Sequence, residues 1–326
     1  MNKGYSLAPL GITADAPSVG KAALANESAF NATFFSQPLT DYAVGFRTDA
    51  GKVEALLDFL APKVQTSRRF QYKKADNGSA FAAVADNDDV RAIGGEFKTV
   101  EARGDIVDSH TVSKGLTTVV DRDELDENPN VLEQKVAWLK LLLLRGDAIR
   151  AWAVLNAAAS NTAKTWSASA GAPDQDLLAA LDTAGDSMGF NPNRILFGST
   201  AWQKRLLCLG ASDKAAGFAG FSMKPADLAQ FLGIDEILIS SERYQASVSA
   251  KSKVTTANVA LLFSGFANAS TEDASNAKLF WSPAMGGGEY AVFKDETSSE
   301  NIKITVMHKS QIVLANSLGI QKITVS

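Results

Sequence analysis

The sequence predicts an α+β fold built around one long helix, and three observations lead to that prediction. A helical pattern that is apolar on almost every side runs from about residue 129 to about residue 159. After it, helical stretches alternate with short apolar strands, which is typical of a compact α/β unit. Near the C-terminus, NIKITVMHKSQIVL and GIQKITV alternate apolar and polar residues, which predicts closing β-strands.

Composition places the chain among ordinary globular proteins and argues against several functional classes. Of its 326 residues, 46% are apolar and 21% are charged, so a large hydrophobic core can form. The net charge of −4 provides no basic footprint for nucleic acid. The single cysteine, Cys208, rules out a disulfide framework within one chain and fits a reducing cytoplasm. The N-terminal stretch lacks the apolar core of a secretory signal, so we expect none.

Residues typical of catalytic and metal sites are scarce. The two histidines, His110 and His308, lie far apart in strand-like stretches, and the spacings of zinc sites are absent. GFRTDAGKV looks like a phosphate-binding loop, but Val53 stands where a Ser or Thr would reach magnesium. The run Gly286 to Gly288 precedes a strand-like stretch, which indicates a turn. We therefore predict no catalytic residue, no cofactor and no metal, and a protein that is not an enzyme.

Residues 1–48 are predicted to form an extended N-terminal arm. They are low in charge, rich in small residues, and show no sustained helical or strand period. Such a segment cannot bury its aromatic side chains against itself, so we expect Phe30, Phe34 and Phe35 to dock elsewhere, on a neighbouring subunit for example. A disordered tail is the alternative. Residues 49–65 are predicted to hold a short amphipathic helix, Asp49 to Leu60, which Pro62 ends.

Residues 66–124 predict a long two-stranded excursion with a flexible polar tip. The outer parts, SRRFQYKK and TVSKGLTTVVDRDE, alternate and are rich in β-branched and aromatic residues, whereas the middle is rich in turn formers. A hairpin of this length is only marginally stable alone, so we expect it to lie on a partner surface. Its base is basic and its tip is acidic, and the two could pair between subunits. The residues predicted to make these contacts are Arg68, Arg69, Lys73 and Lys74 at the base and Asp86, Asp88 and Asp89 at the tip.

Residues 125–160 contain the long helix, whose central sequence is VAWLKLLLLRGDAIRAWAVL. Its charged residues are too frequent for a membrane span, so no membrane association is expected. Asn128-Pro129 is a helix-start signal. At 100° per residue, Glu133, Lys140 and Asp147 share one narrow stripe, which we expect to be its only solvent-facing strip. The residues predicted to pack this helix against its surroundings are Val136, Leu139, Leu142, Leu143, Ile149 and Trp152.

The remaining chain divides at about residue 280. Residues 161–280 begin with a turn-rich connection and continue with helical stretches such as DLLAALDTAGDSM and TAWQKRLLCLG, which alternate with strand-like RILFGS and ANVALLF. Residues 281–326 are predicted to be closing strands that return to pair beneath the long helix. This order of elements is an arm, a short helix, a long hairpin, a rod-like helix, an α/β domain and closing strands.

In this order the chain resembles the Hong Kong 97-type major capsid proteins of tailed double-stranded DNA bacteriophages. The resemblance is carried by SRRFQYKK to TVVDRDEL, by PNVLEQKVAWLKLLLLRGDAIRAWAVLNA, by NPNRILFGSTAWQKRLL with FLGIDEILISSERYQ, and by NIKITVMHKSQIVLANSLGIQKI. It covers nearly the whole chain, although its motifs are patterns and not invariant signatures. It implies an N-arm (1–48), an extended loop (66–124), a peripheral domain with a spine helix (125–160) and closing strands (281–326), and an axial domain (161–280).

The resemblance also implies a function and partners. The expected function is that of a structural subunit that assembles with itself, as hexamers and pentamers, into an icosahedral phage head. The head would enclose double-stranded DNA without sequence-specific contact and would assemble in the bacterial host cytoplasm. A portal and a decoration protein are expected partners. The residues before the first helix are too few for a built-in scaffolding region, which favours a separate scaffolding protein.

Two further possibilities follow from the same residues. Some members of the family join subunits by a Lys–Asn bond, and Lys73, Lys74 and Lys98 are candidate lysines, although no Asn is singled out. The alternative functions are the shell of a bacterial nanocompartment with the same fold and a soluble α/β enzyme. Particle size and contents would distinguish the first of these from a phage head. A monodisperse 34.5 kDa monomer would favour the second.

Overall fold

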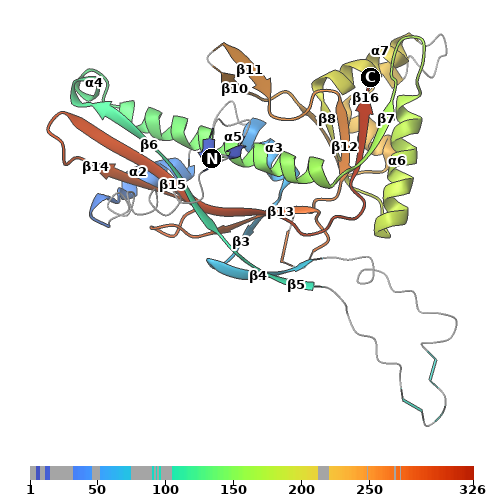
Figure 1. The fold of residues 1–326 in the computed structure, drawn as a ribbon, viewed down its shortest axis with the longest axis horizontal. Coiled ribbons are helices and arrows are strands. Elements are labelled where there is room, and N and C mark those ends of the chain that lie inside the picture. Colours follow the sequence, from blue (N-terminus) through green and yellow to red (C-terminus); the bar gives the residue numbers. More distant parts are fainter. Residues whose placement is uncertain are drawn as a thin grey trace.

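The long helix and two β-sheets organise the molecule (Figure 1). The computed structural model describes residues 5–7, 12–14, 32–45, 52–74, 90–91, 93, 95–96, 105–211, 220–247, 249–267, 269–271 and 273–326. In these ranges each of the two main sheets has five strands, and the long helix passes from one sheet to the other.

Helix α5, Val131–Ala158, is the long helix that the sequence predicts, and its 28 residues make a rod about 42 Å long. A short helix, α4 (Arg122–Glu127), precedes it. Asn128 ends α4 as its C-cap, so α5 begins two residues later than the predicted start at Pro129. Asn128 still shapes the junction, because its Oδ1 accepts a hydrogen bond from the Asn130 backbone N–H at 3.1 Å.

The first sheet is centred on β15, Asn301–Leu314, which pairs antiparallel with three strands. Strand β6 (Val112–Asp121) follows one of its edges over ten residue pairs. Strands β14 (Tyr290–Asp295) and β13 (Ala277–Ser282) share its other edge, one after the other. Strand β3 (Lys63–Gln65) then pairs in parallel with β13. Helix α5 contacts β6, β13 and β15, so the closing strand β15 lies beneath the long helix as predicted.

The second sheet has the order β7 (Ser160–Lys164), β16 (Gln321–Val325), β12 (Val259–Phe263), β8 (Arg194–Gly198) and β9 (Glu236–Ser240). Every residue of β8 and β12 is buried, as expected for central strands covered on both faces. Helices α6 (Pro173–Met188), α7 (Ser199–Gly210) and α9 (Pro225–Leu232) share a hydrophobic core with this sheet. A separate hairpin, β10 (Arg243–Ser247) with β11 (Ala250–Lys253), completes this part.

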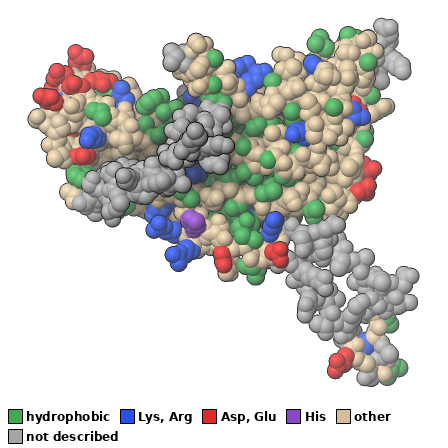
Figure 2. Space-filling view, in the orientation of Figure 1, with side chains coloured by type: hydrophobic (Ala, Val, Ile, Leu, Met, Phe, Trp, Pro, Cys, Tyr) green, Lys and Arg blue, Asp and Glu red, His purple; other side chains and the backbone are tan. Residues whose placement is uncertain are grey.

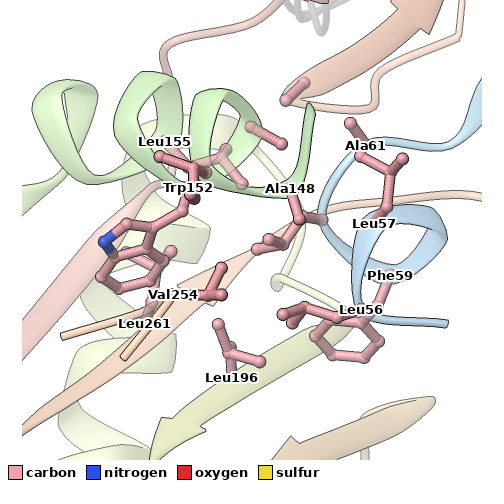
Figure 3. Packing of buried hydrophobic residues seen from close by; sticks show 14 of the residues in the cluster. Leu56, Leu57, Phe59, Ala61, Ala148, Trp152, Leu155, Leu196, Val254 and Leu261 are labelled. Carbon is pink, nitrogen blue, oxygen red and sulfur yellow. The ribbon is translucent and has the colours of Figure 1, made fainter. Parts of the chain in front are cut away.

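One hydrophobic core joins the long helix to strands of both sheets (Figure 3). Helix α3, Lys52–Leu60, contributes Leu56, Leu57 and Phe59, and α5 contributes Ala148, Trp152 and Leu155. Leu196 and Leu261 come from the second sheet, while Ala277 and Leu279 come from the first. The predicted helix of residues 49–60 is therefore present. It packs beside α5 in the core that the two sheets share.

The long hairpin is supported by its own subunit at its base, which corrects the prediction that it lacks local support. Strands β4 (Arg69–Lys74) and β5 (Asp105–His110) form an antiparallel ribbon of six residue pairs. Phe70 of β4 packs on Phe280 of β13 with ring centroids 4.4 Å apart, and Tyr72 packs on the same ring at 5.9 Å. The returning chain then leaves β4 and joins the first sheet as β6. The aromatic residues of SRRFQYKK make this possible, because their alternation places both on one face.

The N-terminal region has more structure than the predicted arm. Strands β1 (Tyr5–Leu7) and β2 (Ile12–Ala14) pair with each other, and the 3-10 helix η1 (Ala32–Phe34) leads to α2 (Gln37–Gly45). Helix α2 packs beside β14, where the Val292 backbone N–H donates to Thr40 Oγ1 at 3.0 Å. Only Thr40 and Ala43 of its nine residues are buried, a stripe too narrow to show as a helical period in the sequence.

The closing strands divide between the two sheets, which differs from the predicted segment of residues 281–326. Strand β13 already belongs to the first sheet, whereas β16 crosses to the second and pairs with β12 and β7. Ile323 and Val325 of β16 are buried in the core of the second sheet. The alternating pattern of GIQKITV predicts a strand correctly, but it carries no information on which sheet that strand joins.

The anchoring of the hairpin base predicts a cost for removing the ring on which it packs. Phe280 is fully buried, so Phe280→Ala should lower the free energy of unfolding by about 3 kcal/mol, measured by urea denaturation. Ile106→Ala on β5 is the matched control, because Ile106 is 71% exposed and its truncation should cost less than about 0.5 kcal/mol. Equal effects of the two substitutions would contradict the anchor.

Candidate assembly surfaces

A groove with a basic rim lies at the base of the β4–β5 ribbon. Its volume is about 1150 Å³. The side chains of Arg68 and Arg69 are exposed there, and Lys73 and Lys74 follow on the same strand. Figure 2 shows several Lys or Arg side chains beside a histidine on this side of the molecule. The lining residues are Thr66, Ser67, Arg68, Arg69, Phe70, Gln71, Asp108, Ser109 and His110.

The alternation of β4 explains how the groove is held. Phe70 and Tyr72 point into the subunit, so Arg69 and Gln71 point away from it. Gln71 Nε2 donates to Asp108 Oδ1 across the ribbon at 2.8 Å, which ties the two strands on the outer face. The basic side chains are therefore presented by a ribbon whose other face is anchored in the core.

An acidic end lies at the opposite end of β6. We define it as the exposed carboxylates of α4: Asp123, Glu124, Asp126 and Glu127. No residue of α4 is buried, and Figure 2 shows these carboxylates concentrated at one end of the molecule. Asp121 caps the helix by accepting a hydrogen bond from the Asp123 N–H at 3.0 Å, and Glu124 pairs with Lys135 at 3.2 Å. The sequence shows these residues only as an acidic run, which usually means a solvated face.

A buried charge network lies between α5, β6 and β15. Asp147 of α5 is 1% exposed, and its Oδ1 accepts hydrogen bonds from Lys114 Nζ at 2.7 Å and from Arg150 Nη1 at 2.6 Å. Ser310 of β15 donates to its other oxygen at 3.2 Å. Burial is the largest single influence on Asp147 and opposes its ionisation. The charge and hydrogen bond of Lys114, together with His308 and Arg150, outweigh burial and lower the pKa of that carboxyl below its ordinary value.

This network corrects the predicted solvent-facing strip of the long helix at two of its three residues. Lys140 and Asp147 are buried, whereas Glu133 is exposed as predicted. Lys140 is 3% exposed and donates to the Ala43 carbonyl oxygen of α2 at 2.7 Å. Trp138, on the side opposite Asp147, is 51% exposed. The helical period identified the stripe correctly. At Lys140 and Asp147 the stripe points inward, because buried partners on α2 and β6 satisfy charges that would otherwise require water.

His308 of β15 lies beside this network and is 2% exposed. Its ring stacks on Tyr290 with centroids 5.3 Å apart, and its Nε2 lies 3.5 Å from Asp147 Oδ2 without a hydrogen-bond partner. Burial is the main cause that lowers the pKa of His308 to about 4. Among the described residues, no group of three or more His, Cys, Asp or Glu side chains is placed to hold a metal ion. His308 is therefore a neutral packing residue at pH 7.

Comparison with known proteins shows similarity in structure and not in sequence. No protein-family model matches the chain, and no curated protein matches its sequence. A phage-related protein from Bordetella bronchiseptica RB50 matches with a TM-score of 0.65 at 14% identity, over 89% of this chain and 96% of that chain. A putative capsid protein of a prophage from E. coli CFT073 matches with a TM-score of 0.51 at 10% identity, over 90% and 99%. An encapsulin complex from Synechococcus elongatus PCC 7942 has a lower TM-score, 0.46, at 10% identity over 93% and 94%.

The chain has the Hong Kong 97-type capsid fold. Its similarity to these structures extends along almost the whole chain, so the fold predicted from the order of elements is confirmed. In this Hong Kong 97-type fold the groove and the acidic end lie at the two ends of β6.

The structure places some of the residues predicted to contact other subunits. Phe35 packs edge-on against Phe293 of its own β14, with ring centroids 6.0 Å apart, and Phe34 packs against the same small core. Their burial therefore needs no neighbouring copy. Phe30, the tip residues Asp86, Asp88 and Asp89, and Lys98 lie outside the described residues.

The residues predicted to pack the long helix are buried with one exception. Leu142 is only partly buried. The buried packing residues of α5 are Val136, Leu139, Leu143, Ile149 and Trp152.

None of the helices in the described ranges has the length and apolar character needed to cross a membrane.

Sequence reasoning missed two features of these surfaces. Asp147 was expected to face water. Its position in a helix with almost no polar face was a signal that it needs a buried partner. The acidic run around α4 is solvated, as its composition indicates, but the run alone does not show that it lies at one end of the molecule. The acidic run lies between a predicted strand and the long helix, where the chain reverses direction, and this position indicates an end of the molecule.

The buried pair predicts an asymmetric response to substitution. Asp147→Ala should lower the free energy of unfolding by about 3 kcal/mol, because it leaves the Lys114 ammonium mostly buried and without its carboxylate. The double variant Lys114→Met/Asp147→Leu should lose less than half as much, since apolar groups replace both charges. Lys135→Ala, which breaks the exposed pair with Glu124, should cost less than about 1 kcal/mol. Urea denaturation measures all three, and a double variant that loses as much stability as Asp147→Ala would contradict the coupling.

Burial of neutral His308 predicts a pH dependence of stability. Its folded pKa of about 4 lies below the ordinary value of 6.5, so the unfolded chain binds the proton more readily. The stabilisation is complete above about pH 6.5 and is lost as the pH falls towards 4, with about 1 kcal/mol lost between pH 7 and pH 5.5. His308→Phe should reduce this difference, whereas His110→Gln, at an exposed position, should preserve it. Urea unfolding curves at pH 7 and pH 5.5 measure this difference in the free energy of unfolding. An unchanged difference in His308→Phe would refute the assignment to His308.

Proposed function

We propose that this chain is the major shell subunit of a phage head. In this proposal it assembles with itself as hexamers and pentamers into an icosahedral shell around double-stranded DNA. The observation that carries the proposal is similarity over 89% of this chain and 96% of a phage-related protein at a TM-score of 0.65. The match over 90% of this chain to a putative prophage capsid protein supports the same function.

The exposed edge of the first sheet supports self-association. In the described part of the chain, β6 pairs only with β15, so its other edge presents unpaired backbone groups over ten residues. It also exposes Val112, Leu116 and Val119, which are 43%, 38% and 54% exposed. Long edge strands in single molecules are usually shortened or covered, because they pair with other chains. A subunit that is covered by its own copies has no such requirement.

The contacts in this proposal use the residues that the sequence singled out. Arg68, Arg69, Lys73 and Lys74 contact a neighbouring copy from the base of the hairpin. Phe30 and the exposed parts of Phe34 and Phe35 contribute from the N-terminal arm, and Asp86, Asp88 and Asp89 contribute from the hairpin tip. The burial of α5 supports its role as a rigid spine that holds these surfaces at fixed positions.

The domain organisation follows the two sheets. We assign the peripheral domain to the first sheet with α5, and the axial domain to the second sheet with α6, α7 and α9. The N-terminal arm and the extended loop keep the segments 1–48 and 66–124. Three strands differ from the segments that the sequence suggested. Strands β6 and β13, which lie in or mostly in the segments 66–124 and 161–280, pair in the first sheet, and β16 pairs in the second.

The role is structural and not enzymatic, and its location is the phage head after assembly in the host cytoplasm. The net charge of −4 suits a container for DNA, because a strongly basic wall would bind the genome tightly instead of letting it pack and leave. A separate scaffolding protein, a portal and a decoration protein are the further partners. They act during assembly, at one vertex and on the outer surface.

Assembly of the purified chain tests the proposal. Size-exclusion chromatography with light scattering should give masses that are multiples of 34.5 kDa, and negative-stain microscopy should show rings or shells. Co-expression with a scaffolding protein encoded nearby should increase the fraction of closed shells, and correct shells without any partner would refute the separate scaffold. A monomer at all concentrations would favour a soluble enzyme and refute a shell subunit. Small shells filled with protein would indicate a nanocompartment.

A further inference from the structure

Segments of opposite charge lie next to the two ends of strand β6. The basic groove lies before it, at Arg68, Arg69 and His110. The acidic end begins directly after it, with α4. Figure 2 shows the two groups of side chains well separated on the same face. The subunit is thus positively charged near the start of β6 and negatively charged near its end.

These two charged surfaces cannot meet within one chain. Strand β6 has ten residues, and at about 3.4 Å per residue it holds its ends about 34 Å apart. All ten residues of β6 are paired with β15, and α5 packs against both strands. Strand β6 therefore cannot bend to bring the basic groove onto α4 of the same chain. This separation is several times the Debye length of about 8 Å at physiological ionic strength. Each surface must therefore satisfy its charge with solvent or with another molecule.

The basic side chains have no ionic partner in the described part of their own chain. Neither Arg68, Arg69 nor Lys73 forms an ion pair there, and at the acidic end the same is true of Asp126 and Glu127. Glu124 has Lys135, so the acidic end is only partly neutralised. Both surfaces thus keep their charge available for a partner.

We propose that the basic groove of one copy binds the acidic end, α4, of a neighbouring copy. The contact rests on the proposed self-assembly and names the surfaces that meet in it. It joins two different patches, so it is heterologous, and repeating it gives rings or larger assemblies instead of closed pairs. It replaces the hairpin tip with α4 as the acidic partner of the basic base. The contact fixes the relative position of neighbours more than it adds affinity, because exposed ion pairs are individually weak.

A protein partner fits the groove better than nucleic acid. The groove includes its own carboxylate, Asp108, which Gln71 holds on the outer face of the ribbon. A carboxylate at this position repels a phosphate backbone, which needs a continuous basic surface. Every copy of the chain also brings one acidic end for each groove. The two surfaces are therefore present in equal numbers in any assembly of identical chains.

Charge reversal with complementation between variants tests this contact. Arg68→Glu/Arg69→Glu makes both surfaces acidic, and Asp126→Lys/Glu127→Lys makes both basic. These substitutions remove no ion pair, hydrogen bond or buried side chain that the structure shows. Each variant alone should need about tenfold or more protein than the wild type for half-maximal assembly, measured by sedimentation velocity. An equimolar mixture should assemble like the wild type, because every groove then finds an α4 of opposite charge.

Matched controls separate the possible outcomes. Asp182→Lys/Asp186→Lys reverses two exposed carboxylates on α6, and it should assemble like the wild type and fail to complement Arg68→Glu/Arg69→Glu. Thermal unfolding checks that each variant is folded. If Asp126→Lys/Glu127→Lys assembles normally, or the mixture stays dissociated, α4 is not the partner. Assembly of Arg68→Glu/Arg69→Glu at the wild-type level with loss of DNA binding would assign the groove to nucleic acid instead. A wild type that remains monomeric refutes the proposed function and this contact together.

Discussion

The fold depends on the burial of one long helix against two sheets at once. Helix α5 buries thirteen of its 28 residues, and its C-terminal half packs with α3 against strands of both sheets in a single core. Its N-terminal half covers the first sheet and α2. The two sheets therefore share one rigid element, and their relative position follows from the packing of Ala148, Trp152 and Leu155. Everything that the first sheet carries, including the return strand of the hairpin, is positioned by this helix.

That burial creates a constraint, because two charged residues of α5 are carried into the interior. Asp147 and Lys140 are placed where β6, β15 and α2 supply partners, so each charge forms hydrogen bonds in the absence of bulk water. A buried ion pair adds little net stability, but a missing partner is costly. The network therefore acts as a check on register: β6 can pair with β15 in only one way that brings Lys114 to Asp147. This register also determines where the groove and α4 lie.

The same geometry connects the fold to assembly. A stiff ten-residue strand separates a basic groove from an acidic helix, and the hairpin base is anchored by aromatic packing on β13. A subunit with unlike surfaces held apart on a rigid frame repeats well against its copies, because each contact leaves the next pair of surfaces free. The individual ion pairs are weak, so the assembly they favour is reversible at each contact and becomes stable through their number. Such reversibility would suit the proposed shell, in which misplaced subunits must be able to leave.

The sequence alone determined the order and type of the main elements. The α5 helix, the strands RILFGS, ANVALLF and NIKITVMHKSQIVL and the helices after Pro173 all follow from periodicity and from proline and glycine positions, which act locally. The sequence did not show that Lys140 and Asp147 face inward, that Phe70 and Tyr72 pack on Phe280, that β16 crosses to the second sheet, or that α2 forms. A period of 3.6 or 2 says which residues share a face, but the direction of that face is set by partners distant in sequence. Only the tertiary structure brings those partners together, and it alone decided that the two charged surfaces lie at opposite ends of one strand.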